Sequence, residues 1–193
     1  MTVWIARRYV VADVEGNGQR PPDLVELAVV PIVDGVIGEP TSWLFRPDKP
    51  ITTMARRIHG ISNDMVAQAP VFASLEADVR ARLNDVVLVA HNAGIDLGVL
   101  KRKLPGFAPT EVLDTLKLSR RLLPGEPSYR LGALVTMLDL GSGLPPGLRP
   151  HRAAYDVLVT ARLFVHLASQ TEAGPLSLEA LRGDSGGDDA ALF

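Results

Sequence analysis

The chain has 193 residues, four histidines, no cysteine and a formal net charge of -2. This length suits one domain with its own core, and the lack of cysteine excludes disulfide frameworks, thiolate metal sites and cysteine nucleophiles. The chain also lacks the overall positive field of proteins that charge alone holds on nucleic acid, although local basic patches remain. Its first residues lack the order of a secretory signal, and no run approaches about 18 apolar residues. We therefore expect a cytoplasmic protein without a membrane segment.

The first part of the chain predicts three antiparallel strands. Residues 9–14 are rich in β-branched side chains and stop at a glycine-rich turn. Residues 24–33 form a second apolar run, and a third strand over residues 36–45 returns beside it after an Asp-Gly hairpin turn. Pro31 lacks a backbone N–H, so it predicts an edge position or a bulge within the second strand.

Helical and extended patterns alternate in the rest of the chain. Residues 72–83 carry apolar side chains at helical spacing, whereas residues 86–90 and 112–114 predict short strands, the first of them buried on both faces. Further helices are expected over residues 51–58, 96–104, 115–123, 130–140 and 152–168. The expected fold is α/β, with a mixed five-stranded sheet, three strands antiparallel and then two parallel, flanked by helices. Residues 1–170 form one expected domain, and residues 171–193 predict a short helix followed by a flexible acidic tail.

Asp13 and Glu15 stand two positions apart near the end of the first predicted strand. Because side chains of a strand alternate between faces, both carboxylates point to one side and can share a ligand. A D-x-E pattern alone is common in proteins. Here it follows an apolar run, where two carboxylates would be costly without a cation or another partner. This placement favours a functional pair.

Three later acidic residues stand at boundaries of predicted elements. Asp96 ends the segment HNAGID, and it is either a site residue or a first-turn carboxylate favoured by the helix dipole. Asp156 ends HRAAYD, in which His151 comes five residues earlier. Five residues turn a helix by about 140°, so we expect His151 just before the helix rather than inside it. Asp114 either supports the site from behind or, more simply, caps the next helix.

The motifs D-x-E, HNAGID and HRAAYD occur in this order, each at the boundary of an element. Together with Val25-Glu26-Leu27-Ala28 and His59-Gly60-Ile61, they make the chain resemble the DnaQ-like, or DEDDh, 3′–5′ exonucleases, which include proofreading subunits of bacterial DNA polymerase III. The resemblance covers residues 9 to 167 and implies an RNase H-like fold. It also implies site roles, with Asp13, Glu15, Asp96 and Asp156 as metal-binding carboxylates and His151 as the general base.

The chemistry of these residue types agrees with that resemblance. Four carboxylates without cysteine suit hard cations such as Mg²⁺ or Mn²⁺, and two ions would activate a water and stabilise the leaving 3′ oxygen. Histidine can take up a proton near neutral pH. The resemblance implies hydrolysis of phosphodiester bonds at the 3′ end of single-stranded or frayed DNA, with release of nucleoside 5′-monophosphates.

Two departures from the family pattern concern the grip on the 3′ end. The family usually has Thr-Thr-Gly or Thr-Ser-Gly after D-x-E, whereas this chain has Gly16-Asn17-Gly18. An aromatic residue usually precedes the aspartate of the second motif, and Ile95 stands there in this chain. These changes leave the metal-binding residues whole and alter the contacts with the terminal nucleotide.

The expected substrate contacts come from four segments of the chain. Gly16, Asn17 and Asn92 are the candidate contacts with the terminal nucleotide. Arg152, at the start of a predicted helix, is the best candidate for a phosphate. His59 either lines the same cleft, as its motif does in the family, or closes a turn.

Nucleic acid is the expected partner, and two alternative functions stay open. One is an exonuclease of RNA or of short oligonucleotides, because related families share these carboxylates and no motif here reads a 2′-hydroxyl. The other is a non-catalytic accessory module of a polymerase complex, against which the intact acidic residues argue. The C-terminal Ala190-Ala191-Leu192-Phe193 resembles peptides that bind bacterial sliding clamps, with Asp189 near the place of the usual glutamine. A DNA polymerase or a sliding clamp is therefore a candidate partner.

Overall fold

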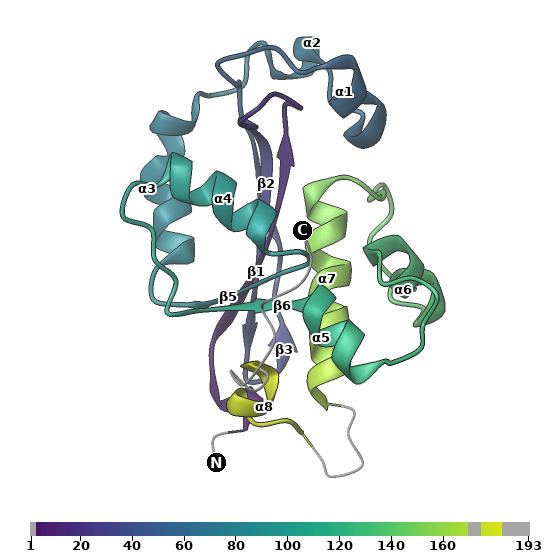
Figure 1. Ribbon diagram of the computed structural model, residues 1–193. Coiled ribbons are helices and arrows are strands. Elements are labelled where there is room, and N and C mark those ends of the chain that lie inside the picture. Colours follow the sequence, from purple (N-terminus) through teal and green to yellow (C-terminus); the bar gives the residue numbers. More distant parts are fainter. Residues whose placement is uncertain (1–2, 170–174, 183–193) are drawn as a thin grey trace.

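The computed structural model describes residues 3–169 and 175–182, which form a mixed sheet with helices on both faces (Figure 1). The strands are β1 (Tyr9–Gly16), β2 (Leu24–Val33), β3 (Val36–Ile37), β4 (Thr41–Leu44), β5 (Val87–Ala90) and β6 (Glu111–Asp114). Over the described residues they make one six-stranded sheet in the order β3-β2-β1-β5-β6, with β4 also paired to β2. The first four strands pair antiparallel, whereas β1, β5 and β6 run parallel. The predicted mixed sheet is confirmed.

A sixth strand arises because the predicted third strand, residues 36–45, is broken into β3 and β4. The pairing of β2 shifts by one residue between these two short strands. The break lies opposite Pro31, whose carbonyl accepts a hydrogen bond from the Gly38 N–H at 2.9 Å. Proline supplies no N–H to continue the ladder on that side, so the strand opposite it bulges. The irregularity that Pro31 predicts is therefore present, but it lies in the strand opposite β2 rather than in β2, which is paired on both sides. The count of five strands was one too low.

The helices are α1 (Thr53–His59), α2 (Asn63–Val66), α3 (Phe72–Leu83), α4 (Gly94–Lys103), α5 (Thr115–Leu122), α6 (Leu131–Met137), α7 (Ala153–Ser169) and α8 (Leu178–Arg182). They cover one apolar core on each face of the sheet, and α1 and α2 cover a third, smaller one that contains Ala55 and Val66. On one face of the sheet Val11 packs with residues of α5, α6 and α7, among them Leu163. On the other face Val10 packs with Val79 of α3 and Leu100 of α4. Because side chains alternate between the two faces of β1, this strand contributes to the cores on both faces of the sheet. Helices lie on either side of the strands in Figure 1.

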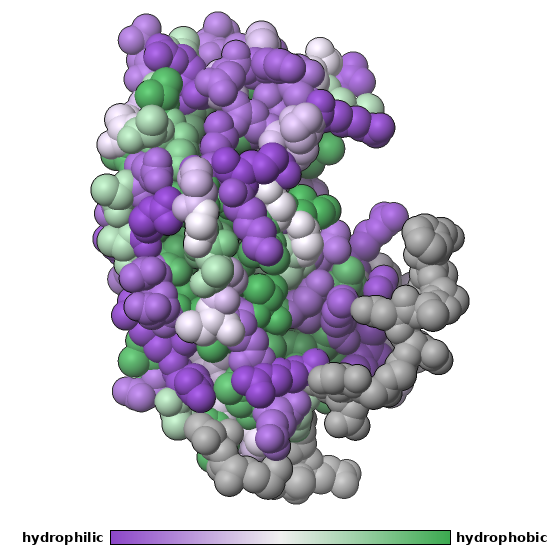
Figure 2. Space-filling model, turned by 60° about the vertical axis from the view of Figure 1, so that its left-hand side comes forward, coloured by the Kyte–Doolittle hydropathy of each residue, from purple (hydrophilic) through white to green (hydrophobic). Residues whose placement is uncertain are grey.

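The carboxyl ends of β1, β5 and β6 lie at the same edge of the sheet because these strands run parallel. The short helices α1 and α2 lie beyond the end of β1 (Figure 1). Figure 2 shows hydrophilic side chains over most of one face and a hollow in the surface below the end formed by α1 and α2. Ligand sites of α/β sheets occur at this edge of the strands, so the fold directs attention to it.

The C-terminal helix α8 packs back on the domain. Its buried Leu178 and Leu181 belong to the core that includes α7, and Arg182 forms an ion pair with Glu111 of β6. None of the helices within residues 3–169 and 175–182 is long and apolar enough to cross a membrane. The expected flexible tail and the clamp-like residues 189–193 lie outside the described residues.

Candidate active site

Three carboxylates meet at the carboxyl end of β1. Asp13 and Glu15 extend from the same strand, and Asp156 comes from the first turn of α7. One carboxylate oxygen from each residue lies within 4.8 Å of the others. The spacing of two along β1 puts the first pair on one side, and the packing of α7 against β1 brings the third residue to them. The cluster joins residues far apart in the sequence.

Asp96 reaches β1 from the first turn of α4, although it does not belong to that group of three. Its side chain is buried, and its Oδ1 accepts a hydrogen bond from the Val14 N–H at 3.0 Å. This bond fixes the carboxylate against the strand segment that carries Asp13 and Glu15. Burial is the main cause that raises the pKa of Asp96 to about 7, although the bond from Val14 lowers it.

Crowding disfavours the charged forms of these acids. Burial, followed by the charge of Asp156, raises the pKa of Glu15 to about 8, and burial raises that of Asp156 to about 6. The pKa of Asp13 also lies well above its ordinary range, because of burial first and then the neighbouring Asp96. A cation would relieve both the burial and the repulsion.

One carboxylate oxygen of Asp13 indicates where a cation would bind. Asp13 Oδ2 is buried and has no hydrogen-bond partner among the described residues. A buried carboxylate oxygen is costly without a partner, and an all-oxygen donor set suits a hard divalent cation. The residues present therefore fit the divalent cation that the sequence motifs imply.

His151 lies just before α7, as the five-residue spacing predicts, because the helix begins at Ala153. Its backbone is left-handed, with φ of 60°, which is uncommon outside glycine and asparagine. Burial raises the pKa of Asp156, whereas the charge of the nearby His151 imidazole and the His151 backbone N–H lower it. The side chain is exposed beside the cluster.

Glu26 fixes the turn that carries His151, and the sequence motifs did not assign it a role. It is buried in β2 with 5% of its surface exposed. Its carboxylate accepts hydrogen bonds from Arg152 Nε at 2.9 Å and from the Ala153 N–H at 3.0 Å. A single charged residue in an apolar strand was the available signal. Arg152, which the sequence suggests as a phosphate contact, forms an ion pair with this buried carboxylate and keeps part of its own side chain exposed.

Asn17 builds the turn after β1. Its side chain is fully buried, and its Nδ2 donates to the Lys49 carbonyl at 3.1 Å. Its Oδ1 accepts from the backbone N–H groups of Gln19 and Asp23, at 3.1 and 2.9 Å. The polar atoms of this amide are thus engaged within the chain.

His59 closes the same turn from α1. Its Nδ1 accepts a hydrogen bond from the Ile61 N–H at 3.0 Å, so the other nitrogen, Nε2, carries the ring proton and donates to the Gly16 carbonyl at 3.2 Å. Burial lowers the pKa of His59 and favours this neutral form. The residue therefore satisfies the turn-closing alternative while its ring lines the neighbouring hollow.

A hollow of about 310 Å³ opens beside the carboxylates, between α1 and α4, and we call it the α1–α4 hollow. It is lined by Val14, Glu15, Gly16, Gly18, Pro22, Thr52, Met54, Ala55, Ile58, His59, Ile95 and Val99. Three apolar side chains at its rim are exposed, Met54 to 67%, Ile58 to 53% and Ile95 to 60%. Exposed apolar groups around a hollow mark a surface that binds another molecule.

Asn92 lies elsewhere. It occupies the turn between β5 and α4, and its N–H donates to Asp114 Oδ1 at 2.9 Å. It lines a different hollow, together with Asp114 and Lys117, and not the α1–α4 hollow. Asn92 therefore lines a different hollow from Gly16 and Glu15.

The mixed sheet with acidic residues from β1, α4 and α7 defines a nuclease-type domain of RNase H-like architecture. A solved structure described as exonuclease X in complex with 5′ overhanging duplex DNA superposes with a TM-score of 0.70 at 38% identity, over 82% of this chain and 90% of the other. A second, the nuclease domain of 3′hExo, has a TM-score of 0.68 at 18% identity over 86% and 94%, a likeness of fold alone.

A family model described as Exonuclease (RNase_T) matches residues 10–164, so the chain belongs to this exonuclease family, as its DnaQ-like motifs indicate. Exodeoxyribonuclease 10 of Escherichia coli K12 is 41% identical over 75% of this chain and 61% of its own length. The DNA polymerase III subunit epsilon-like protein of Rhodobacter capsulatus is 35% identical over 88% and 25%. The chain thus spans less than two thirds of these curated relatives.

Proposed function

We propose that this protein is a divalent-cation-dependent 3′–5′ exonuclease that removes nucleoside 5′-monophosphates from the 3′ end of DNA, with residues 1–170 as its catalytic domain. The observation that carries the proposal is the cluster of Asp13, Glu15 and Asp156 beside an apolar hollow, with one buried oxygen of Asp13 lacking a partner among the described residues. Membership of the exonuclease family supports it.

The metal-binding residues of this proposal are Asp13, Glu15, Asp96 and Asp156, and they would hold two Mg²⁺ or Mn²⁺ ions. When bound, such ions activate a water and stabilise the leaving 3′ oxygen of the phosphodiester. The carboxylates contribute negative charge and fixed positions. Asp96 is anchored by the Val14 N–H, and Asp156 is positioned by the first turn of α7.

His151 is the proposed general base. A ring nitrogen of its exposed imidazole takes the proton of the attacking water, a transfer that histidine supports near neutral pH. The left-handed backbone at His151 sets the side chain outside α7, next to Asp156. The ion pair of Glu26 with Arg152 holds this turn, so we assign Arg152 a positioning role for His151 in place of a phosphate contact.

The terminal nucleotide is proposed to occupy the α1–α4 hollow. Met54, Ile58 and Ile95 offer aliphatic contacts to the faces of its base, and the absence of a side chain at Gly16 allows close approach beside Glu15. Asn17 and His59 shape this wall through the hydrogen bonds of the turn. An aliphatic rim makes no base-specific hydrogen bonds, so we expect little preference among the four bases.

DNA is the favoured substrate because of the relatives. The solved neighbour at 38% identity is described as a complex with duplex DNA, and the E. coli relative is named an exodeoxyribonuclease. RNA or short oligonucleotides remain the second candidate. Relatives named as polymerase III proteins make a DNA polymerase a reasonable partner, and the clamp-like residues 189–193 make a sliding clamp another.

The test is hydrolysis of matched 5′-labelled single-stranded DNA and RNA with Mg²⁺, Mn²⁺ or EDTA. We expect a ladder that shortens from the 3′ end of DNA, needs the cation and disappears in Asp13→Ala. Asp64→Ala is the matched control, because Asp64 is exposed on α2, away from the cluster. A ladder of equal rate in Asp13→Ala, or in EDTA, would contradict the proposal, and a faster ladder on RNA would favour the second candidate.

A further inference from the structure

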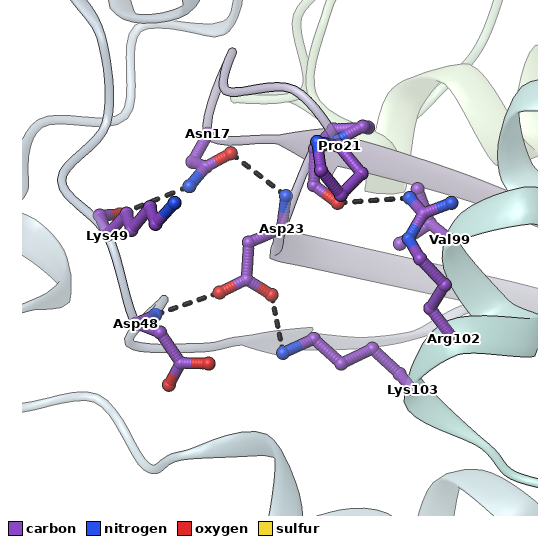
Figure 3. Close-up of a pocket in the computed structure, with 9 residues that line it drawn as sticks. Asn17, Pro21, Asp23, Asp48, Lys49, Val99, Arg102 and Lys103 are labelled. Atoms are coloured by element: carbon purple, nitrogen blue, oxygen red, sulfur yellow. Dashed lines mark hydrogen bonds and ion pairs between the residues drawn. The ribbon is translucent and has the colours of Figure 1, made fainter.

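A second hollow, of about 250 Å³, lies between the turn after β1, the loop before α1 and the last turn of α4 (Figure 3). It is lined by Asn17, Pro21, Pro22, Asp23, Asp48, Lys49, Val99, Arg102 and Lys103. We call it the Lys49–Arg102 hollow, after the two cations on its opposite sides in Figure 3. The proposed function does not use it.

The acidic residue at the centre of this hollow is already neutralised. Asp23 forms an ion pair with Lys103 and accepts hydrogen bonds from the N–H groups of Asp48 and Leu24, each at 2.8 Å. The bond from Lys103 leads the interactions that lower the pKa of Asp23, against the effect of its partial burial. Asp23 and Lys103 together therefore add little net charge to the hollow.

Lys49 and Arg102 supply the remaining positive charge. Both side chains are exposed, and neither forms an ion pair with an acidic residue in the described parts of the chain. Arg102 donates one hydrogen bond, to the Pro22 carbonyl at 3.0 Å, which holds its guanidinium over the hollow. Asp48 also lines the hollow and forms no ion pair within the described residues, so the two acidic and three basic residues of the lining leave a net charge of +1. Its carboxylate points away from Lys49 (Figure 3). Two cations that face each other across a hollow suit a phosphodiester group.

The position of this hollow restricts which strand could reach it. Pro22 and Val99 line both hollows, so the Lys49–Arg102 hollow directly adjoins the α1–α4 hollow. Glu15 lines the α1–α4 hollow, whereas none of the described acidic residues of the candidate active site lines the Lys49–Arg102 hollow. From the carboxylates outward, the order is therefore active site, α1–α4 hollow, Lys49–Arg102 hollow.

An exonuclease cuts the bond between the terminal nucleotide and the rest of its strand. With the terminal nucleotide in the α1–α4 hollow, the rest of that strand leaves from the other side of the scissile phosphate, on the side of the carboxylates. The strand being shortened ends before it reaches the Lys49–Arg102 hollow. A complementary strand that continues past a recessed 3′ end, in line with the terminal nucleotide, would extend in this direction.

We propose that the Lys49–Arg102 hollow binds the phosphate backbone of a complementary strand that continues past a recessed 3′ end. The inference rests on the proposed exonuclease function, since it takes the place of the terminal nucleotide from it. Binding of the complementary strand makes the protein more efficient on a 3′ end recessed behind a 5′ overhang than on a blunt end of the same sequence.

The test compares one 3′-terminal strand presented single-stranded, in a blunt duplex and in a duplex with a 5′ overhang. In the Lys49→Ala/Arg102→Ala variant, kcat/KM on the recessed duplex should fall about tenfold, whereas that on the single strand should change by less than about twofold. Lys101→Ala is the matched control. Its exposed side chain stands on the same helical turn without lining the hollow, so both substrates should keep their rates.

Binding measured by fluorescence anisotropy in EDTA separates this inference from the chemistry. For the recessed duplex, the slope of log Kd against log salt concentration should shrink by about 0.7 for each phosphate that the variant no longer neutralises. Neutral methylphosphonate linkages in the overhang should weaken binding of the unmodified protein by about as much as the double variant does. They should weaken the double variant no further, because the same interaction has already been removed.

Equal losses on single-stranded and recessed DNA, or no effect of neutral linkages, would overturn the inference. Overhang-dependent binding without hydrolysis of any substrate would reject the proposed function and leave the binding site intact. Normal hydrolysis of the single strand, with no dependence of binding on the overhang, would reject the binding site and leave the proposed exonuclease function intact.

Discussion

Asp13 and Asp114 stand near the carboxyl ends of two parallel strands, β1 and β6, yet their carboxylates are used in opposite ways. Asp114 caps α5 and accepts hydrogen bonds from the N–H groups of Asn92, Ala93 and Leu116 at 2.9 to 3.1 Å. Asp13 has a buried oxygen without a partner among the described residues and lies among other acids. A satisfied carboxylate stabilises a fold, whereas a crowded and unsatisfied one marks a binding site.

The largest expected effect is that of a substitution at Asp13, the unsatisfied carboxylate of this pair. Asp13→Asn keeps the shape of the side chain and removes its charge, so we expect kcat on single-stranded DNA to fall by at least about 10⁴-fold, as for groups that act as a unit. The same change at Asp114 should leave kcat within about threefold, because Asp114 bonds backbone groups only. Steady-state rates of the two variants decide it, and comparable rates would erase the distinction.

His151 tests the proton transfer at the same cluster. His151→Ala should lower kcat by about 10²- to 10⁴-fold, the usual worth of a general base, while the carboxylates keep their affinity for Mg²⁺. Isothermal titration with Mg²⁺ checks the second part. A variant that loses cation binding together with its rate would show that His151 holds the carboxylates rather than moves a proton.

Arg152 extends the comparison to a charged side chain whose guanidinium already has a partner within the chain, Glu26. Arg152→Lys loses the two-point contact with Glu26, so His151 is held less firmly and kcat should fall by about 10- to 100-fold. KM should stay nearly constant, because the guanidinium is bound to Glu26. A rise in KM with an unchanged kcat would instead restore the phosphate contact expected from the sequence.

The pH dependence of stability without the cation tests the raised pKa values of Glu15 and Asp156. Folding raises the pKa of Glu15 to about 8 and that of Asp156 to about 6, so the cation-free folded state binds more protons than the unfolded chain. The stabilisation of the folded state by these bound protons is complete below about pH 4, and it is lost as pH rises through the two folded-state pKa values. The Tm without metal should therefore decline between pH 5 and 8 relative to Glu15→Gln. Saturating Mg²⁺ at pH 8 should restore about 5 to 10 °C, and an equal gain in Glu15→Gln would contradict this.

The smallest effect belongs to the cap of α5. Asp114→Ala removes the acceptor of three backbone N–H groups and should lower the free energy of unfolding by about 1 to 2 kcal/mol, or the Tm by about 2 to 8 °C. Asp64→Ala, exposed on α2, is the control for loss of one acidic charge. An unchanged Tm in Asp114→Ala would show that its hydrogen bonds are replaced by water at no cost.

Much of the fold could be predicted from local patterns. The helix over residues 72–83 was placed at its true bounds, because periodicity is a property of the chain itself, and the missing N–H of Pro31 signalled an irregularity of strand pairing at that position. The break that creates β4 was missed, since its position depends on the pairing partner. The predicted helix over residues 130–140 ends at Met137, before the left-handed backbone of Asp139, which no composition signal marks.

The sequence by itself determined that Asp13 and Glu15 share a face, that His151 precedes its helix, and that the chain is an exonuclease relative. Only the tertiary structure decided the partners of the polar side chains. Asn17, His59 and Arg152, expected near the substrate, are hydrogen-bonded within the chain, while Lys49 and Arg102 face a hollow. Spacing along a strand or helix follows from fixed backbone geometry, but the partner of a polar group depends on which distant segments fold within reach.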